Sequence, residues 1–232
     1  MTQITRPADQ VVVRDRPIGP ALWRTAGCLA IAHVVLLFAG FSQEKSVVLT
    51  DGPATVARVY GSGSLGRIFT GGYVETLSFL VLLPCLVFLG RALGRDEGAK
   101  WAAQTALGAG LVYVCTTLAA GIPAGAAAVY GAHHGLASAG TLTVVNDVRT
   151  FAFYLSLLAL GVVSLGFGIA ALRDGVLTRW TGWGGVAVGS LLLLGPAGQR
   201  WSDTINTTSL LWMIWWVGVG VALIRQGTAE RP

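Results

Sequence analysis

Charged residues are scarce in this chain. Asp, Glu, Lys and Arg make up 12% of its 232 residues, whereas a soluble globular domain usually has about 25%. Five stretches run at least 19 residues without any of these four residue types. A hydrocarbon core about 30 Å thick takes about 20 helical residues to cross. The composition therefore excludes an ordinary soluble domain and predicts a polytopic helical membrane protein.

Cysteine is scarce as well. Cys28, Cys85 and Cys115 are single residues within apolar stretches, and no C-x-x-C spacing occurs. This pattern excludes a disulfide framework and a cysteine-rich zinc site. The apolar stretches lack the lysine that a retinal Schiff base needs, and no phosphate-binding glycine loop is present. We predict no cofactor.

The uncharged windows predict an all-α bundle with six transmembrane spans. Residues 1–20 are predicted to be a disordered cytoplasmic tail, 21–226 the transmembrane domain and 227–232 a second cytoplasmic tail. The charged residues that bound the windows place the spans at 24–44, 67–91, two between 100 and 173, 179–200 and 203–225. Six spans put both termini on the same side of the membrane.

The distribution of basic residues predicts the orientation. Of the 16 Lys and Arg residues, 11 fall on the side that carries the termini, and such residues are enriched in cytoplasmic loops. We therefore expect a multi-pass protein of the bacterial inner membrane with both termini cytoplasmic. The net charge of +5 does not predict nucleic-acid binding, because the basic residues lie beside the spans. The expected partners are membrane lipid, a lipophilic small molecule, and a second copy or another membrane protein.

Two connections carry further patterns. Residues 44–70 space their apolar residues as an amphipathic helix does, which predicts a lid on the outer surface that is broken at "GSGS". The inner connections "ALGRDEGAKW" and "ALRDGVLTRW" resemble each other. Either a helical hairpin has been duplicated, or both are ordinary inner turns with an interfacial Trp, and both interpretations stay open.

Glu75 is the main functional candidate, because it stands alone inside a predicted span. Only 15 residues separate it from Arg91, which is about 22 Å of helix. This length places Glu75 about 7 Å below the outer edge of the hydrocarbon core. A carboxylate at that depth usually faces the interior of the bundle and marks a functional site. The alternative is a protonated Glu that is hydrogen-bonded for structure.

Three histidines are weaker candidates. His33 falls near mid-membrane on the first span, where it either packs through a hydrogen bond or shares a proton with Glu75. His133 and His134 precede the fourth span and are weak metal candidates, because zinc would need a third ligand. We predict no metal site.

Polar and aromatic residues near the last three spans complete the candidate site. Asp147 and Arg149 open the fourth span above Tyr154, and Arg149 suits an interfacial anchor. Arg200 and Asp203 lie three residues apart in the outer turn and suit a local ion pair. Further down the last span, Trp212 and Trp216 share a face, as a packed helix contact or as the wall of a ligand site.

The polar residues within and beside the spans gather in the outer half of the molecule. This asymmetry predicts an outward-opening pocket, polar at its rim and apolar below. The predicted ligand-binding residues are His33, Glu75, Arg149, Tyr154, Arg200, Trp212 and Trp216.

The stretches "LWRTAGCLAIAHVVLLFAG" and "GIAALRDGVLTRWTGWGGVAVGSLLLL" carry a family likeness. Over most of residues 20–225 the chain resembles an uncharacterised family of bacterial integral membrane proteins that is common in actinobacteria. The resemblance implies no reaction, so it assigns no catalytic residue.

Two functions compete. In the first, the protein binds a lipophilic molecule or lipid in the outer pocket, or is an accessory to a membrane complex. In the second, it is an enzyme of acid-initiated isoprenoid chemistry, resembling the integral membrane terpene cyclases, with Glu75 as proton donor and Asp147 and Asp203 assisting. A proton-coupled transporter is disfavoured, because the inner half lacks a polar path.

Overall fold

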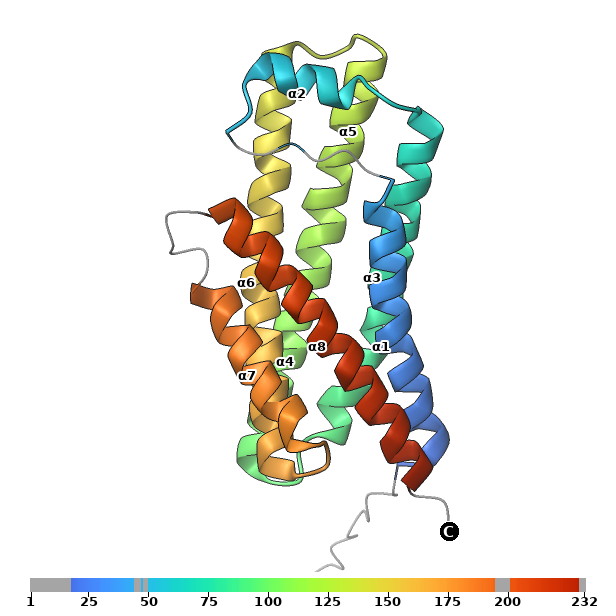
Figure 1. Ribbon diagram of the computed structural model, residues 1–232, viewed down its shortest axis with the longest axis vertical. Helices are drawn as coiled ribbons and strands as arrows, with labels where there is room; N and C mark the ends of the chain where they lie inside the picture. The colour runs from blue at the N-terminus through green and yellow to red at the C-terminus, as the bar shows by residue number, and fades with distance from the viewer. Residues whose placement is uncertain (1–17, 44–46, 48–49, 195–200, 230–232) are drawn as a thin grey trace, which may run out of the picture.

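The computed structural model describes residues 18–43, 47, 50–194 and 201–229, the last range without the side chains of 201–206. Over these residues the fold is all-α, as predicted, and no β-strand occurs in them (Figure 1). The helices are α1 (Pro20–Phe41), α2 (Pro53–Tyr60), α3 (Leu65–Ala92), α4 (Glu97–Thr116), the π-helical turn η1 (Thr117–Gly121), α5 (Ile122–His133), α6 (Ala139–Asp174), α7 (Arg179–Leu194) and α8 (Trp201–Ala229).

Five of the described helical stretches are long and apolar enough to cross a membrane. They are Pro20–Phe41, Leu65–Ala92, Glu97–His133, Ala139–Asp174 and Thr207–Ala229. The stretch from Glu97 to His133 joins α4, η1 and α5 without a break. The chain therefore has the helices of an integral membrane protein.

The predicted fifth span corresponds to α7, which has 16 residues. At 1.5 Å per residue it is about 24 Å long, less than the hydrocarbon core of about 30 Å. The predicted span also included 195–200, which lie outside the described residues. The described helix alone therefore does not establish a sixth span.

The long helices of the bundle run between two opposite ends of the molecule (Figure 1). α3, α5 and α6 reach furthest toward the end opposite the start of α1 and the end of α8, which is named the outer end after the predicted orientation. There α2 lies across α5 and α6. α7 and α8 stop well short of that end. At the opposite, inner end, Arg24 of α1 donates two hydrogen bonds to Gly227 O of α8, at 2.9 and 3.2 Å. From this contact α1 and α8 diverge toward the outer end.

Glycine lets three helix pairs approach closely. A methyl group at Gly27 of α1 would lie 2.5 Å from Gly220 O of α8. A methyl group at Gly168 of α6 would lie 2.8 Å from Gly182 O of α7, and one at Gly40 of α1 would lie 2.9 Å from Gly71 O of α3. No side chain fits at these points. The glycines inside apolar stretches thus set the helix pairing, as is common in membrane bundles.

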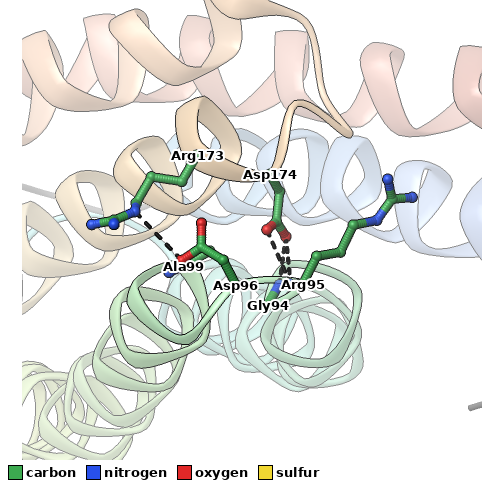
Figure 2. A network of polar contacts seen from close by, with 6 residues as sticks. All are labelled: Gly94, Arg95, Asp96, Ala99, Arg173 and Asp174. Atoms are coloured by element: carbon green, nitrogen blue, oxygen red, sulfur yellow. Dashed lines mark hydrogen bonds and ion pairs between the residues drawn. The ribbon is translucent and has the colours of Figure 1, made fainter.

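The two similar inner connections contact each other (Figure 2). Asp174 accepts hydrogen bonds from Gly94 N at 2.5 Å and Arg95 N at 3.0 Å. Arg173 Nε lies 3.5 Å from Asp96 Oδ1, and Asp96 also accepts from Ala99 N at 2.8 Å as the cap of α4. The Ala99 N–H and the nearby Arg173 guanidinium hold the pKa of Asp96 below its usual value. These contacts fix the ends of α3, α4 and α6 relative to one another.

The outer segment 44–70 is helical in part. α2 spans Pro53–Tyr60 and breaks near "GSGS", as predicted, but the apolar residues after the break open α3 instead of a second surface helix. Apolar side chains join α2 to α5 and α6 in a small cluster of Val47, Val56, Tyr60, Ala128, Val129 and Leu142. α2 is therefore packed onto the bundle, and residues 44–46 and 48–49 lie outside the described residues.

Candidate ligand-binding cavity

A cavity of about 960 Å³ lies inside the outer half of the bundle. Its walls come from α1, α3, α6, α8 and the continuous stretch α4–η1–α5. Tyr60, the last residue of α2, lines it from the roof. The mouth has exposed apolar residues on its rim: Phe38 is 50% exposed, Tyr73 65% and Leu210 50%. Phe38 belongs to α1, Tyr73 to α3 and Leu210 to α8, so exposed side chains of three helices line the cavity.

Aromatic rings form one wall deep in the cavity. Phe79 and Tyr113 lie 5.3 Å apart between ring centroids, and Tyr113 and Trp212 lie 6.3 Å apart. All three rings are buried and line the cavity. Trp216 stacks behind Trp212 at 5.6 Å, with 17° between the ring planes. Trp212 therefore serves both as a packed helix contact and as the cavity wall, whereas Trp216 does not reach the cavity.

His33 lies behind this wall. Its ring is fully buried, 5.8 Å from both Phe79 and Trp212. Nδ1 lies 2.8 Å from Ser78 O, and because a carbonyl only accepts, Nδ1 carries the proton. Nε2 has no hydrogen-bond partner in the described part of the chain. The hydrogen bond of His33 is thus made to the backbone of α3, and neither ring nitrogen forms the hypothesised pair with Glu75.

Glu75 and Arg149 line the same cavity from different walls, α3 and α6. Arg173 lies at the inner end of α6, and Arg149 precedes it by 24 residues on the same helix. Gln104, eight residues after the cap of α4, donates to Gly90 O of α3 at 3.0 Å. Glu75 lies a further 15 residues up α3 from Gly90. By the helical rise, Arg149 lies about 36 Å from Arg173. Glu75 lies about 26 Å from the end of α3 at Ala92, and Gly94, two residues further, belongs to the inner network.

The cavity extends along α6 below Arg149. From Arg149 the cavity continues down to Leu160, 11 residues further along α6, which is about 16 Å. The described lining thus carries the charged residues Glu75 and Arg149 and is largely apolar toward Leu160.

The π-helical turn η1 provides the wall that sequence patterns did not identify. Thr117, Gly121 and Gly125 line the cavity there, on or directly after the turn. π-helical turns are rare and concentrate at functional sites. Pro123, with no backbone N–H to give, was the signal in the sequence that this helix is irregular.

The roof is held by one buried hydrogen bond. Tyr60 Oη donates to Asn146 Oδ1 at 2.7 Å, and these two residues are each 1% exposed. The bond joins α2 to α6 directly above the cavity. Neither residue was among the predicted site residues, because a surface-helix Tyr and an Asn carry no distinguishing spacing.

The remaining predicted site residues are placed as follows. Tyr154 lines the cavity. Asp147 is half-buried on α6, but it is absent from the described cavity lining. Arg200 and the side chain of Asp203 lie outside the described residues. His133 ends α5 and His134 packs on Tyr130 at 4.2 Å, and the described residues contain no cluster of three ligands that could hold a metal ion.

Residues 25–227 match the family described as a domain of unknown function, DUF4386. The chain belongs to this family. The expected membership of an uncharacterised family is thus confirmed, and the match includes every described residue that lines the cavity. No match was found among the curated proteins or the solved structures.

We predict that Tyr60→Phe loosens the roof. The substitution leaves the buried Asn146 Oδ1 without its donor, which costs about 1–3 kcal/mol of stability. Hydrogen–deuterium exchange of residues 53–60 should increase, and the thermal midpoint in detergent should fall. Tyr73→Phe, on the exposed rim, is the matched control and should change neither. Unchanged exchange in Tyr60→Phe would show that this bond does not hold α2.

Proposed function

We propose that this protein binds a lipid or a similar lipophilic small molecule in the outer cavity, and that the ligand enters sideways from the membrane between α1 and α8. The cavity itself carries the proposal. Its volume of about 960 Å³ is at the upper end of the range for small-molecule sites. Its described lining is largely apolar and carries two charged residues, Glu75 and Arg149, which suit contact with a headgroup. This polarity profile is that of a lipid in the outer leaflet.

We also propose six spans with both termini cytoplasmic. α6 ends at the inner end of the bundle, and α8 begins toward the outer end and is long enough to cross a membrane. Because α6 ends on the inner side and α8 starts toward the outer side, the chain between them crosses the membrane once more. In this proposal α7 is that crossing, as a short span. The inner end carries the exposed Trp101, Trp180 and Trp183, as expected of an interfacial belt, and most of the Lys and Arg residues.

Cysteine labelling tests this topology. In a variant whose three native cysteines are replaced by Ala, Ala54→Cys on α2 should react with a membrane-impermeant maleimide in intact cells. Thr178→Cys, in the connection from α6 to α7, should react only after permeabilisation. Both positions are exposed, so access to the reagent depends on the side of the membrane. Labelling of Thr178→Cys in intact cells would contradict the proposed orientation.

Filling the cavity tests the binding function. A methyl group at Gly121 would have only Thr117 Cγ2 within 4 Å, at 4.0 Å, so Gly121→Trp should fit into the free space. We expect several-fold less lipid to be retained by this variant than by the wild type in native mass spectrometry. Gly108→Trp is the control, since Gly108 is exposed on α4 with nothing within 4 Å. Equal retention by both variants would contradict binding in this cavity.

The aromatic wall supports a second candidate, acid-initiated isoprenoid chemistry. Glu75 is 6% exposed and lies one turn above Phe79, and aromatic faces stabilise cations. In such a reaction, a protonated Glu75 gives its proton to an alkene carbon, whose π electrons form the new C–H bond. The neighbouring carbon becomes the cation. Loss of a proton from an adjacent carbon to Glu75 then gives an isomer and restores the acid.

This candidate predicts an isomer of unchanged mass when the purified protein is incubated with a linear polyprene such as squalene. Gas chromatography with mass spectrometry would detect it. Glu75→Gln should abolish the product, because the amide has no acidic proton, while leaving lipid retention in place. A product formed by Glu75→Gln at the wild-type rate, or no product from the wild type, would exclude this chemistry for that polyprene.

A further inference from the structure

The cavity has a floor at its inner end. α1 and α4 run outward, so their first lining residue is the innermost, whereas α3, α6 and α8 run inward and end the lining with their last. All of these side chains are buried and belong to the main hydrophobic core. The floor consists of Leu37, Phe79, Tyr113, Leu160, Trp212 and Met213. A ligand that reaches the floor therefore ends against packed apolar and aromatic side chains.

The hydroxyl group of Tyr113 is a polar group on this floor. Its ring lies 5.3 Å from Phe79 and 6.3 Å from Trp212 between centroids. Tyr113 Oη forms no hydrogen bond within the described part of the chain. The indole nitrogen of Trp212 has no partner there either, but that atom is fully enclosed. Tyr113 keeps 5% of its surface open and lines the cavity, so its hydroxyl group is the one that a ligand can reach.

Other hydroxyl groups of the lining already donate to the backbone of their own helices. The acceptor is a carbonyl three or four residues earlier, at 2.7–2.9 Å, for Thr76, Thr117, Thr150 and Ser156. Short side chains satisfy their hydroxyl groups locally in this way. The phenol of Tyr113 stands at the far end of a rigid ring, out of reach of its own backbone. Its acceptor has to come from another element or from the cavity.

The protein supplies no such acceptor among the described residues. Glu75 lines the same cavity and acts electrostatically on Tyr113, but no hydrogen bond joins the two side chains. A buried donor that lacks an acceptor costs stability. A phenylalanine at this position would make the same ring contacts without that cost. The hydroxyl group of Tyr113 is therefore accounted for if the ligand accepts a hydrogen bond from it.

We propose that the ligand is a lipophile with an oxygen at its buried end, a hydroxyl or carbonyl group that accepts a hydrogen bond from Tyr113 Oη. This inference rests on the proposed binding function. The oxygen is uncharged, because the floor residues around it are apolar and would desolvate a charge. A chain that ends in a methyl group leaves the donor unpaired. A site with a buried donor discriminates strongly against such an analogue.

Pairs of fatty acids that differ only at the tail test the inference. ω-Hydroxylauric, ω-hydroxymyristic and ω-hydroxypalmitic acids end in a hydroxyl group, and tridecanoic, pentadecanoic and heptadecanoic acids carry a methyl group in its place. Because the carboxylate is common to each pair, its contacts cancel in the comparison. Each acid is titrated into delipidated full-length protein and quantified by native mass spectrometry. At the length that reaches the floor, we expect the hydroxyl-ended acid to bind about tenfold more tightly than its partner.

Tyr113→Phe removes the hydroxyl group and keeps the ring. This variant should lose the preference for the hydroxyl-ended acid while still binding the methyl-ended one. Tyr73→Phe is the matched control, because Tyr73 lines the same cavity at its rim and is 65% exposed. It should keep the wild-type preference. A variant that merely unfolds would lose both members of every pair.

The outcomes separate this inference from the function beneath it. Equal affinity of the wild type for both members of every pair, or a preference that Tyr113→Phe retains, would overturn the buried oxygen while leaving lipid binding in place. A preference that Tyr73→Phe abolishes would place the oxygen at the rim and overturn the role of the floor. If the wild type binds neither series, the proposed function fails as well.

Discussion

The arrangement of the cavity depends on the close contact of α1 and α8 at the inner end. Arg24 binds Gly227 O there, and Gly27 and Gly220 let the two backbones approach. Because α1 and α8 are joined at one end and cross at an angle, they separate at the other (Figure 1). A bulkier residue at Gly220 would push the helices apart at the inner end and alter the opening at the outer end. The separation of α1 and α8 at the outer end is therefore a consequence of glycine packing at the opposite end of the bundle.

Helix length sets the position of the polar groups. α6 has 36 residues, or about 54 Å, far more than a hydrocarbon core of about 30 Å. A helix of this length carries the polar residues Asn146 and Arg149 in its first half and the apolar residues Leu157 and Leu160 further along. Arg149, Leu157 and Leu160 all line the cavity, so one cavity has a polar end and an apolar end along a single helix.

The sequence was sufficient for the helical membrane fold, because uncharged stretches and their flanking charges depend only on composition. It also identified Glu75, Arg149, Tyr154 and Trp212, since costly polar or aromatic residues stand out in an apolar chain. It did not predict how α3 and α4 are aligned, because their alignment is set by tertiary contacts such as that of Gln104 with Gly90 O. The Tyr60–Asn146 bond joins residues 86 positions apart, and no local pattern carries such a pair.

The cavity exists because its α5 wall is built from small residues. Gly121 at the end of η1, and Gly125 and Ala126 of α5, leave space where Leu or Phe would fill the core, and the π-helical turn widens the helix. Protein interiors are otherwise packed as densely as organic crystals, and an empty apolar space forfeits the dispersion contacts of its lining. A bundle that kept this volume empty would be less stable than one with larger side chains on α5. An acyl chain in the cavity restores those contacts, and a bound ligand stabilises the folded state by mass action. The small residues of α5 are thus accounted for if the folded protein and its lipid form one packed unit.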